Sequence, residues 1–319
     1  MTVPPLGPAD LPLSRSGLDR HHAAREQEGL LDELWASPQT RILPLWRGRS
    51  LVTAGDGAAS LDLIEPDRQT TALVRVYLGR VVETGTPVIA VTLTDAAAAE
   101  LEPDESRWAG LREAGSVLDE RDYALFVEAV AITNWHESHT HCPRCGTPTV
   151  VEQGGWVRRC FVDGNEVFPR TDPAIIVRVL DDAGRILLGS NAMWENNRWS
   201  ILAGFVEPGE SFEAAVIREV HEESGVVCAA PRYLGSQPWP FPASVMIGFE
   251  ARAVAQGDVP TTPDGHEILA LRWFSRDELW AERDDLKLPG GSSIAHAIIT
   301  EWYGGPLDQP PPAEGHRAA

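Results

Sequence analysis

Three glutamates in the C-terminal half of the chain, Glu219, Glu222 and Glu223, are spaced so that they could bind metal ions together. On a helix, positions i, i+3 and i+4 lie on one face, so the three carboxylates would be neighbours. Like charges at this spacing repel by on the order of a few tenths of a kcal/mol per pair, so a cation or solvent has to compensate. Hard oxygen ligands suit Mg²⁺ or Mn²⁺, which also bridge to phosphate oxygens. A solvated helix face is the alternative for such a run taken alone.

The helix that would carry these carboxylates is predicted to run from Phe212 to Ser224. Ser211 is a good N-cap residue, Glu213 lies in the positively polarised first turn, and Gly225 stops the helix. Val220 and the apolar residues one turn earlier can face a sheet, which leaves the glutamates on another side. The sequence therefore predicts a short amphipathic helix with an acidic face.

A second segment, Ser236-Gln-Pro-Trp-Pro-Phe-Pro-Ala-Ser244, alternates prolines with aromatic residues. Proline fixes the backbone and removes a hydrogen-bond donor, so the segment is predicted to be a stiff extended loop whose rings cannot all be buried in a sheet. Such rings could form a preformed wall for a planar ligand. A rigid structural turn and a proline-rich partner motif are the alternatives.

Three of the four cysteines cluster within residues 139–170, at a spacing that suggests metal binding. Two of them form one knuckle, and the third begins a second knuckle in which an aspartate stands where a fourth cysteine is expected. Zinc accepts carboxylate oxygen, so a Cys3Asp or a Cys3His site is predicted. The candidate ligands are Cys142, Cys145, Cys160 and Asp163, with His139 or His141 as the alternative to the aspartate. A ribbon without metal, in which the thiols are merely buried, is the other possibility.

Composition limits the classes of function. The 319 residues carry a formal charge of −20, which disfavours non-specific nucleic-acid binding. No apolar run approaches the roughly 18–20 residues that span a bilayer, and the N-terminus does not resemble a secretory signal, so we expect no membrane association and a cytoplasmic location. A local basic patch could guide an RNA 5′ end or could consist of solvated arginines; it comprises Arg144, Arg158, Arg159 and Arg170.

Changes in composition along the chain predict five segments. These are a flexible N-terminal tail (1–20), an α+β domain (21–138), a zinc-ribbon-like segment (139–170), a compact α/β domain (171–303) and a flexible C-terminal tail (304–319). Alternating or continuous apolar runs predict strands at 41–45, 72–78, 88–93, 174–180, 186–188, 199–205, 245–254 and 268–274. Helices are expected at 106–114, 120–138 and 292–303, with a short one opened by the capping box of 275–278. The first domain contains no chemical motif that we recognise.

The acidic helix belongs to a longer pattern. Residues Gly204 to Val226 resemble the signature of the Nudix hydrolases, Gly-x5-Glu-x7-Arg-Glu-U-x-Glu-Glu-x-Gly-U with U aliphatic, at every fixed position. The resemblance implies a mixed sheet between helices and hydrolysis of a nucleoside diphosphate linked to a further group. It also implies that Arg218 orients the carboxylates, while Glu219, Glu222, Glu223 and the carbonyl of Ala203 bind two or three Mg²⁺ or Mn²⁺ ions. Glu223 is the leading candidate for activating water, and Glu222 is the alternative base.

The proline-aromatic segment is similar to the hallmark of the NADH pyrophosphatase branch of this family, whose bacterial members also remove NAD caps from RNA. That branch has a zinc ribbon and a divergent α+β domain before the Nudix domain, so the resemblance covers nearly the whole chain. It implies a further metal ligand, Glu267, and a homodimer in which one of two aromatic residues that sandwich nicotinamide comes from the partner subunit. The implied substrate-binding residues are Phe168, Phe205, Gln237, Pro238, Trp239, Pro240, Phe241, Pro242, Ala243, Ser244 and Ala295.

Two positions depart from the pattern of that branch. Asp163 replaces the fourth ribbon cysteine, and Gly155 stands where some relatives have a substrate-contacting acid. The resemblance implies hydrolysis of NAD(H) to nicotinamide mononucleotide and AMP, and of NAD-capped RNA to a 5′-monophosphate end. A broader dinucleotide or ADP-ribose pyrophosphatase is the second hypothesis, and a catalytically silent nucleotide sensor is the third.

Overall fold

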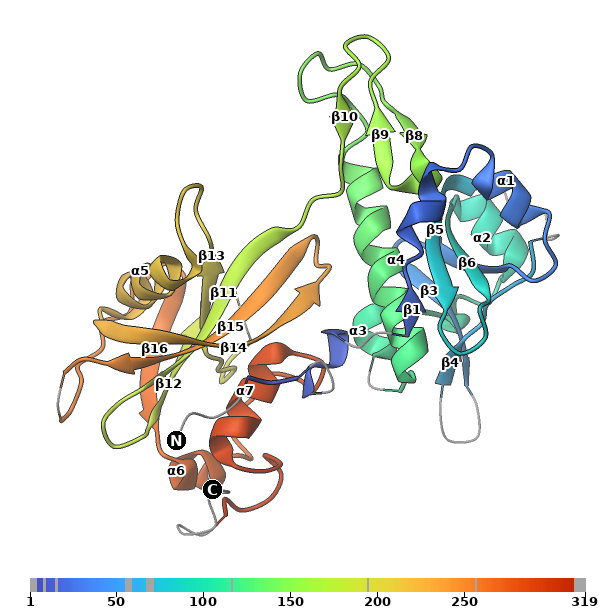
Figure 1. The fold of residues 1–319 in the computed structure, drawn as a ribbon. Helices are drawn as coiled ribbons and strands as arrows, with labels where there is room; N and C mark the ends of the chain where they lie inside the picture. Colours follow the sequence, from blue (N-terminus) through green and yellow to red (C-terminus); the bar gives the residue numbers. More distant parts are fainter. Residues whose placement is uncertain are drawn as a thin grey trace. The chain divides into compact units, whose positions relative to one another are not determined.

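The computed structural model describes residues 5–7, 10–14, 17–54, 59–66, 72–115, 117–193, 195–255 and 257–312. These residues form two compact units. The C-terminal unit comprises residues 172–238 and 244–312 with the described residues before 15, and the N-terminal unit comprises residues 17–171 with 239–243. Figure 1 shows the elements of both units. The tip of the proline-aromatic segment, 239–243, therefore belongs to the N-terminal unit.

The C-terminal unit is built on a mixed sheet that, in the described residues, has six strands in the order β14-β15-β11-β12-β16, with β13 paired to β11. The central pair, β11 and β15, is parallel, while β11 pairs with β12 and β13 antiparallel. The strands are β11 (Asp172–Leu180), β12 (Ile186–Asn191), β13 (Leu202–Phe205), β14 (Cys228–Trp239), β15 (Ser244–Ala253) and β16 (Ile268–Phe274). The helices are α5 (Phe212–Ser224), α6 (Arg276–Ala281) and α7 (Ile294–Tyr303).

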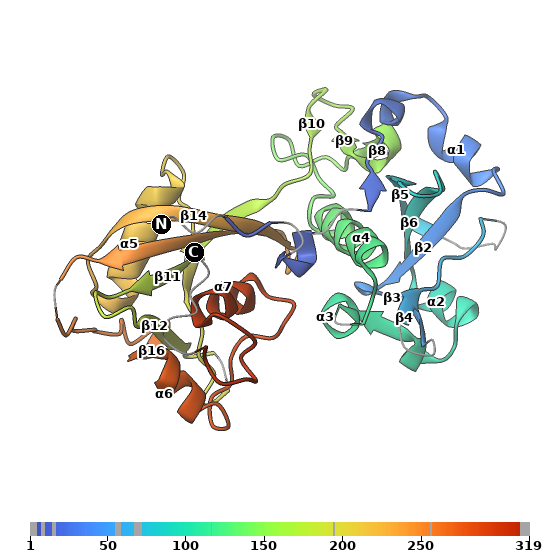
Figure 2. The same cartoon turned by 60° about the horizontal axis from the view of Figure 1, so that its bottom comes forward.

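Helices cover both faces of this sheet because β11 is apolar on both of its sides. Ile175 and Val177 lie in the core that contains Val220 of α5, whereas Ile176 lies in the core that contains Ile298 of α7. Successive strand residues point to opposite faces, so a strand buried on both sides has a continuous apolar run. Figure 2 shows α5 and α7 on opposite sides of the strands. The mixed sheet between helices that the sequence predicts is confirmed.

Part of the segment predicted to be a flexible N-terminal tail lies in the core of the C-terminal unit. The side chain of Leu11 is 1% exposed and packs with Ile176 and the α7 residues. The backbone N–H of Leu6 donates to the carbonyl of Leu234 in β14. Isolated leucines in a proline-rich stretch can pack into a core without the regular spacing of an α-helix or a strand, so sequence periodicity does not detect them.

The N-terminal unit contains a larger sheet and a three-stranded ribbon. The described strands of the larger sheet run in the order β1-β5-β6-β2-β3-β4, with β7 paired to β3. They are β1 (Leu18–Asp19), β2 (Arg41–Trp46), β3 (Arg49–Ala54), β4 (Ala59–Leu61), β5 (Ala72–Val81), β6 (Pro87–Leu93) and β7 (Trp108–Gly110). The helices are α1 (Leu30–Trp35), α2 (Asp95–Leu101), α3 (Leu111–Ala114) and α4 (Glu120–Ser138), and α4 packs against β1, β2 and β5. The ribbon strands are β8 (Val150–Glu152), β9 (Val157–Arg159) and β10 (Glu166–Val167).

Two secondary-structure predictions are wrong. The helix expected at 106–114 is instead a 3₁₀ turn, the strand β7 and the short helix α3, because Trp108 pairs with Leu51 of β3. The stretch 236–239, expected to be loop, is the end of β14, and only residues 240–243 connect it to β15. Long-range pairing outweighs the local preference in both places. Among the described residues, no helix combines the length and apolar character that crossing a bilayer requires.

Candidate active site on helix α5

The limits of α5 follow from its local sequence. The Ser211 hydroxyl accepts a hydrogen bond from the backbone N–H of Ala214, and Gly225 ends the helix with a φ of 69°. At Gly204, in β13, an added Cβ would lie 2.0 Å from the carboxyl carbon of Glu219. The glycine is therefore required because the Glu219 side chain lies against the backbone of this strand. Residue Ala203, whose carbonyl is a predicted ligand, immediately precedes it.

Arg218 holds three carboxylates in place. Its Nε and Nη2 atoms donate to Glu210 at 2.9 and 2.8 Å, and Nη1 donates to Glu219 and to Glu222 at 2.9 Å each. Nη2 also donates to the carbonyl of Phe205 at 3.0 Å. The hydrogen bonds from Arg218 lower the pKa of Glu210. The arginine thus fixes the orientation of the acidic face, as the sequence resemblance implies, while it neutralises only part of the negative charge.

Glu223 is the most unusual carboxylate of this face. Its side chain is 5% exposed, and its Oε2 atom has no hydrogen-bond partner in the described part of the chain. Burial, followed by the charges of Glu219 and Glu267, raises the pKa of Glu223 to about 8. Burial also raises the pKa of Glu219. A buried carboxylate oxygen without a donor, surrounded by other acids, is costly unless a cation joins it. The donor set therefore fits divalent metal ions.

Glu267 reaches this acidic cluster from the loop before β16. The Oδ1 atom of Asp264 accepts the backbone N–H groups of His266, Glu267 and Ile268 at 2.7, 2.9 and 3.0 Å. Asn191 Nδ2 donates to Glu267 Oε1 at 3.3 Å. These contacts order the loop that carries the carboxylate. Neither Asp264 nor Asn191 is among the site residues predicted from the sequence, although the Asp-Gly pair at 264–265 is a turn signal that points to the first.

The predicted substrate-binding residues of the C-terminal unit differ in exposure. Gln237 is fully buried, donates from Nε2 to the carbonyl of Ser292 at 2.9 Å, and has an unpaired Oε1 among the described residues. Ala295 lies in the first turn of α7 and is 3% exposed, and Ser244 is also buried. Phe205, by contrast, is 60% exposed at the end of β13. An exposed aromatic side chain is suited to stack on a planar group.

The remaining predicted substrate-binding residues lie in the N-terminal unit or next to it in sequence. The rings of Trp239 and Phe241 form an edge-to-face pair with centroids 5.0 Å apart. Pro240 is buried, whereas Pro238 and Pro242 are exposed and Ala243 is half-buried. Phe168, which follows β10, is 59% exposed.

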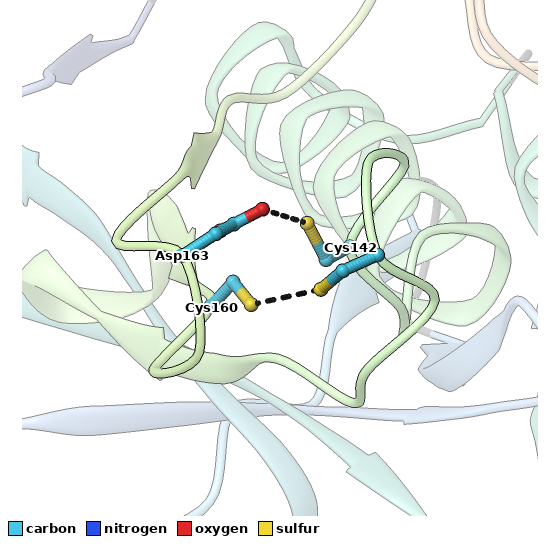
Figure 3. Close-up of side chains that lie close together, drawn as sticks. Cys142, Cys160 and Asp163 are labelled. Atoms are coloured by element: carbon cyan, nitrogen blue, oxygen red, sulfur yellow. Dashed lines mark hydrogen bonds between the residues drawn. The ribbon is translucent and has the colours of Figure 1, made fainter.

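The ribbon brings together the side chains that the sequence predicts as zinc ligands. One ligand atom each from Cys142, Cys145, Cys160 and Asp163 lies within 4.8 Å of the others. Cys142 Sγ lies 3.3 Å from Asp163 Oδ2, and the Sγ atoms of Cys145 and Cys160 are 3.5 Å apart. Figure 3 shows Cys142 on one loop pointing toward Cys160 and Asp163 on another. The histidines 139 and 141 are absent from this cluster, so the arrangement favours Cys3Asp over Cys3His.

Gly155 cannot be replaced by an acid in this fold. Its φ is 96°, and an added Cβ would lie 2.8 Å from Val76 Cα and 2.9 Å from the carbonyl oxygen of Arg75. Both the backbone conformation and the close approach of β5 require glycine here. Whatever contact an acid makes at this position in some relatives is therefore not available to this chain.

The basic patch predicted from the ribbon arginines is only partly available to a ligand. Arg158 is buried, and it donates to Thr149 and to Nδ1 of His136. Arg159 pairs with Glu152 and Glu166. The prediction that the guanidinium group faces an RNA or the solvent is therefore wrong for Arg158, whose partners on other elements cannot be recognised from sequence alone. The side chain of Arg159 is 33% exposed, so for this arginine the prediction stays open.

Comparison with known proteins places these sites in a family. The model of the NUDIX domain matches residues 169–296, that of the NADH pyrophosphatase-like rudimentary NUDIX domain matches 39–135, and that of the NADH pyrophosphatase zinc ribbon domain matches 137–168. The chain is 38% identical over 305 residues to the NAD-capped RNA hydrolase NudC of Mycobacterium bovis, covering 91% of this chain and 94% of that protein. It is 36% identical over 199 residues to the human NAD-capped RNA hydrolase NUDT12, covering 58% of this chain and 42% of that protein. A solved NUDIX hydrolase from Nitrosomonas europaea aligns with a TM-score of 0.41 and 20% identity over 52% of this chain and 94% of that one.

Proposed function

The chain belongs to the Nudix hydrolases of the NADH pyrophosphatase group, and we propose that it hydrolyses the diphosphate of NAD(H) to nicotinamide mononucleotide and AMP. We propose the same reaction on NAD-capped RNA, which would leave a 5′-monophosphate end. The observation that carries the proposal is the buried, unpaired Oε2 of Glu223 within an acidic cluster on the helix that bears the full family signature. A relative that aligns with 91% of the chain is itself an NAD-capped RNA hydrolase by name.

The acidic cluster is proposed to hold Mg²⁺ or Mn²⁺, two or three per site, through Glu219, Glu222, Glu223, Glu267 and the carbonyl of Ala203. Divalent ions supply neutralisation of the diphosphate charge and ease deprotonation of water. Arg218 fixes the carboxylates so that little reorganisation is needed when the substrate arrives. In this proposal the side chains of the protein mainly position the metal ions, and the ions supply the positive charge.

Hydrolysis requires that a water oxygen bond to one phosphorus while the bridging P–O bond breaks and the water proton passes to a base. Glu223 is our candidate for that base, because its unpaired Oε2 is free to accept a proton. Glu222, more than half exposed and held by Arg218, is the alternative. The phosphate that leaves and the phosphate that is attacked become the two mononucleotides.

Recognition of the dinucleotide is proposed to involve Gln237, residues 238–244, Ala295 and the exposed rings of Phe168 and Phe205. In this proposal the protein is a homodimer in which one of these two rings comes from the partner subunit, and it acts in the cytoplasm. Light scattering on the purified protein tests the dimer, and a monomeric mass at micromolar concentration would contradict it.

The proposed reaction is tested by incubating the protein with NADH, NAD⁺, NAD-capped RNA and ADP-ribose in Mg²⁺ or Mn²⁺ and identifying the products by chromatography. We expect nicotinamide mononucleotide and AMP from the dinucleotides and a 5′-monophosphate on the RNA. A higher kcat/KM on ADP-ribose than on every NAD substrate would favour the broader pyrophosphatase. Absence of turnover on all of them would favour a nucleotide sensor.

The ribbon is proposed to bind one zinc ion through three thiolates and Asp163. Replacing zinc by Co²⁺ gives a visible spectrum that reports tetrahedral thiolate coordination. We expect that spectrum in the wild type, a stronger thiolate band in Asp163→Cys, and a weaker affinity in Asp163→Ala. An unchanged spectrum and affinity in both variants would exclude Asp163 as a ligand.

A further inference from the structure

The loop that joins β14 to β15 satisfies only part of its own backbone, through the hydrogen bond that the N–H of Phe241 donates to the carbonyl of Trp239 at 2.7 Å. Prolines at 238, 240 and 242 remove three N–H donors from this short segment, so its carbonyls need donors from elsewhere. Asn134 of α4 supplies them. Its Nδ2 atom donates to the carbonyls of Pro240 and Pro242 at 3.0 Å each. One side-chain amide, more than 100 positions away in the sequence, thus ties two points of the loop together.

Asn134 is itself held in a rigid position. It lies near the end of the 19-residue helix α4, between Thr133 and Trp135, which are 3% and 1% exposed. Helix α4 has a side-chain cap at Asp119, whose carboxylate accepts the backbone N–H of Asp122. Because the helix is anchored in the core of the N-terminal unit, the amide of Asn134 has a defined place from which to bind the loop.

Arg112 of α3 contacts the aromatic rings of the same loop. Its guanidinium carbon lies 4.1 Å from the ring centroid of Phe241 and 5.4 Å from that of Trp239. A cation over an aromatic face is attracted by the ring's electrons. Among the described residues Arg112 has no carboxylate partner, so its charge is directed to the rings. The edge-to-face arrangement of Trp239 and Phe241 is therefore supported from outside the loop.

We propose that Arg112 and Asn134 are positioning residues, which hold the loop 239–243 in the conformation that binds the dinucleotide. This inference rests on the proposed function in that it takes the loop to be part of the substrate site. A loop already held in its binding conformation loses less entropy when the ligand arrives, so its support raises affinity without touching the substrate. According to this proposal, two residues of the rudimentary Nudix domain raise the affinity for the substrate. They do so by holding the loop 239–243, which comes from the C-terminal half of the chain.

The test uses Arg112→Gln, Asn134→Ala and Asn134→Asp in the full chain. The aspartate has the size of asparagine but repels the two carbonyls, so it should behave like alanine. We expect the KM for NADH to rise about tenfold in each variant, through the loss of two hydrogen bonds at Asn134 or of the cation–π contacts at Arg112, while kcat changes less than twofold. Arg112→Lys keeps the cation and should recover part of the affinity.

Two matched controls separate this role from general destabilisation. Arg47→Gln removes another arginine–tryptophan contact of the N-terminal unit, in which the guanidinium lies 5.2 Å from the Trp46 ring. Glu137→Ala changes an exposed residue of the same helix α4. Both controls should leave the KM for NADH unchanged. A rise in KM as large as that of the test variants in either control would overturn the proposal.

Amide hydrogen exchange tests the loop without any substrate. The amides of Trp239, Phe241 and Ala243 should exchange faster in Asn134→Ala and Arg112→Gln, while those of α5 should not change. Unchanged exchange in the loop would overturn the proposal whether or not the protein hydrolyses NADH. If the wild type is inactive on NADH, the proposed function fails. Faster exchange in the loop of the two variants would still support the conclusion that Arg112 and Asn134 hold the loop in place.

Discussion

Within the part of the chain that the structure describes, each unit contains one strongly buried glutamate, and the charges around the two glutamates are opposite in sign. Glu128 of α4 and Glu223 of α5 are both 5% exposed. Burial raises the pKa of Glu128 to about 7 and that of Glu223 to about 8. After burial, the largest effects on the two pKa values come from charged neighbours, and these differ in sign. Arg20 and Arg25 lower the pKa of Glu128, whereas Glu219 and Glu267 raise that of Glu223. Two buried carboxylates therefore lie in different electrostatic settings.

The difference separates a structural carboxylate from one that needs a ligand. Arg20 Nη1 lies 3.3 Å from Glu128, so the N-terminal unit carries its own cation. Around Glu223 the neighbours that shift its pKa are all acids, and a cation has to come from solution. The family matches agree with this division, since the N-terminal half is a rudimentary NUDIX domain and the C-terminal half carries the complete signature. Burial of a carboxylate alone does not identify a catalytic site. The charges of the neighbouring side chains distinguish a metal-binding carboxylate from a structural one.

The largest effect is expected for Glu223→Gln. Loss of a carboxylate that binds metal and accepts a proton should lower kcat for NADH by about 10²- to 10⁴-fold. Binding of NADH, measured by fluorescence titration, should be retained within a fewfold. Glu128→Gln is the matched control, because it removes an equally buried carboxylate but should leave kcat near the wild-type value. Comparable losses in both variants would remove the distinction between the two glutamates.

The next effect concerns pH and stability. The pKa of Glu128 in the folded protein, about 7, exceeds its ordinary value of 4.5, so the folded state binds this proton more tightly than the unfolded chain does. Stability from this group is complete below pH 4.5 and is lost as the pH rises through 7. Relative to Glu128→Gln, the wild type should lose about 2 kcal/mol of unfolding free energy between pH 5 and 8.

Urea unfolding of both proteins across this pH range measures the difference. Glu137→Gln, an exposed glutamate on the same helix, serves as the control and should follow the wild type at every pH. Addition of Mg²⁺ should not alter the pH dependence due to Glu128, since arginines already surround it. A difference that stays constant from pH 5 to 8 would mean that Glu128 keeps its ordinary pKa in the fold.

A smaller effect is expected from the loop that carries Glu267. Asp264→Ala removes the acceptor of three backbone N–H groups, so Glu267 should be less well placed and Mn²⁺ should bind about tenfold more weakly. Asp264→Asn retains an acceptor oxygen and should recover most of the affinity. Equal weakening in both variants would show that the charge of Asp264, and not its hydrogen bonds, supports the site.

The catalytic helix could be predicted from sequence because its determinants are local. The cap at Ser211, the glycine stop at 225 and the spacing of the glutamates all lie within one short segment, and α5 has the predicted limits. The long helix α4 was predicted with equal success, since its apolar residues recur at helical spacing over 19 residues. The clustering of the four ribbon side chains could be predicted for the same reason, because they lie in paired short motifs.

The features that escaped prediction depend on residues far apart in the chain. No strand is predicted at 228–235 and a loop is predicted at 236–239, yet these residues form β14, which pairs with β15. The burial of Arg158 depends on His136 of α4, and the support of the 239–243 loop depends on Asn134. Local sequence patterns contain no information on such contacts, because in its own helix or strand each of these residues has no feature that distinguishes it from other polar residues.

Binding of Mn²⁺, followed by electron paramagnetic resonance of the free ion at neutral pH, tests the central claim most directly. If the acids around Glu223 lack a cation of their own, the wild type should bind Mn²⁺, Glu223→Gln should bind it at least about tenfold more weakly, and Glu128→Gln should match the wild type. The account is contradicted if Glu223→Gln binds Mn²⁺ as tightly as the wild type, or if the wild type binds none.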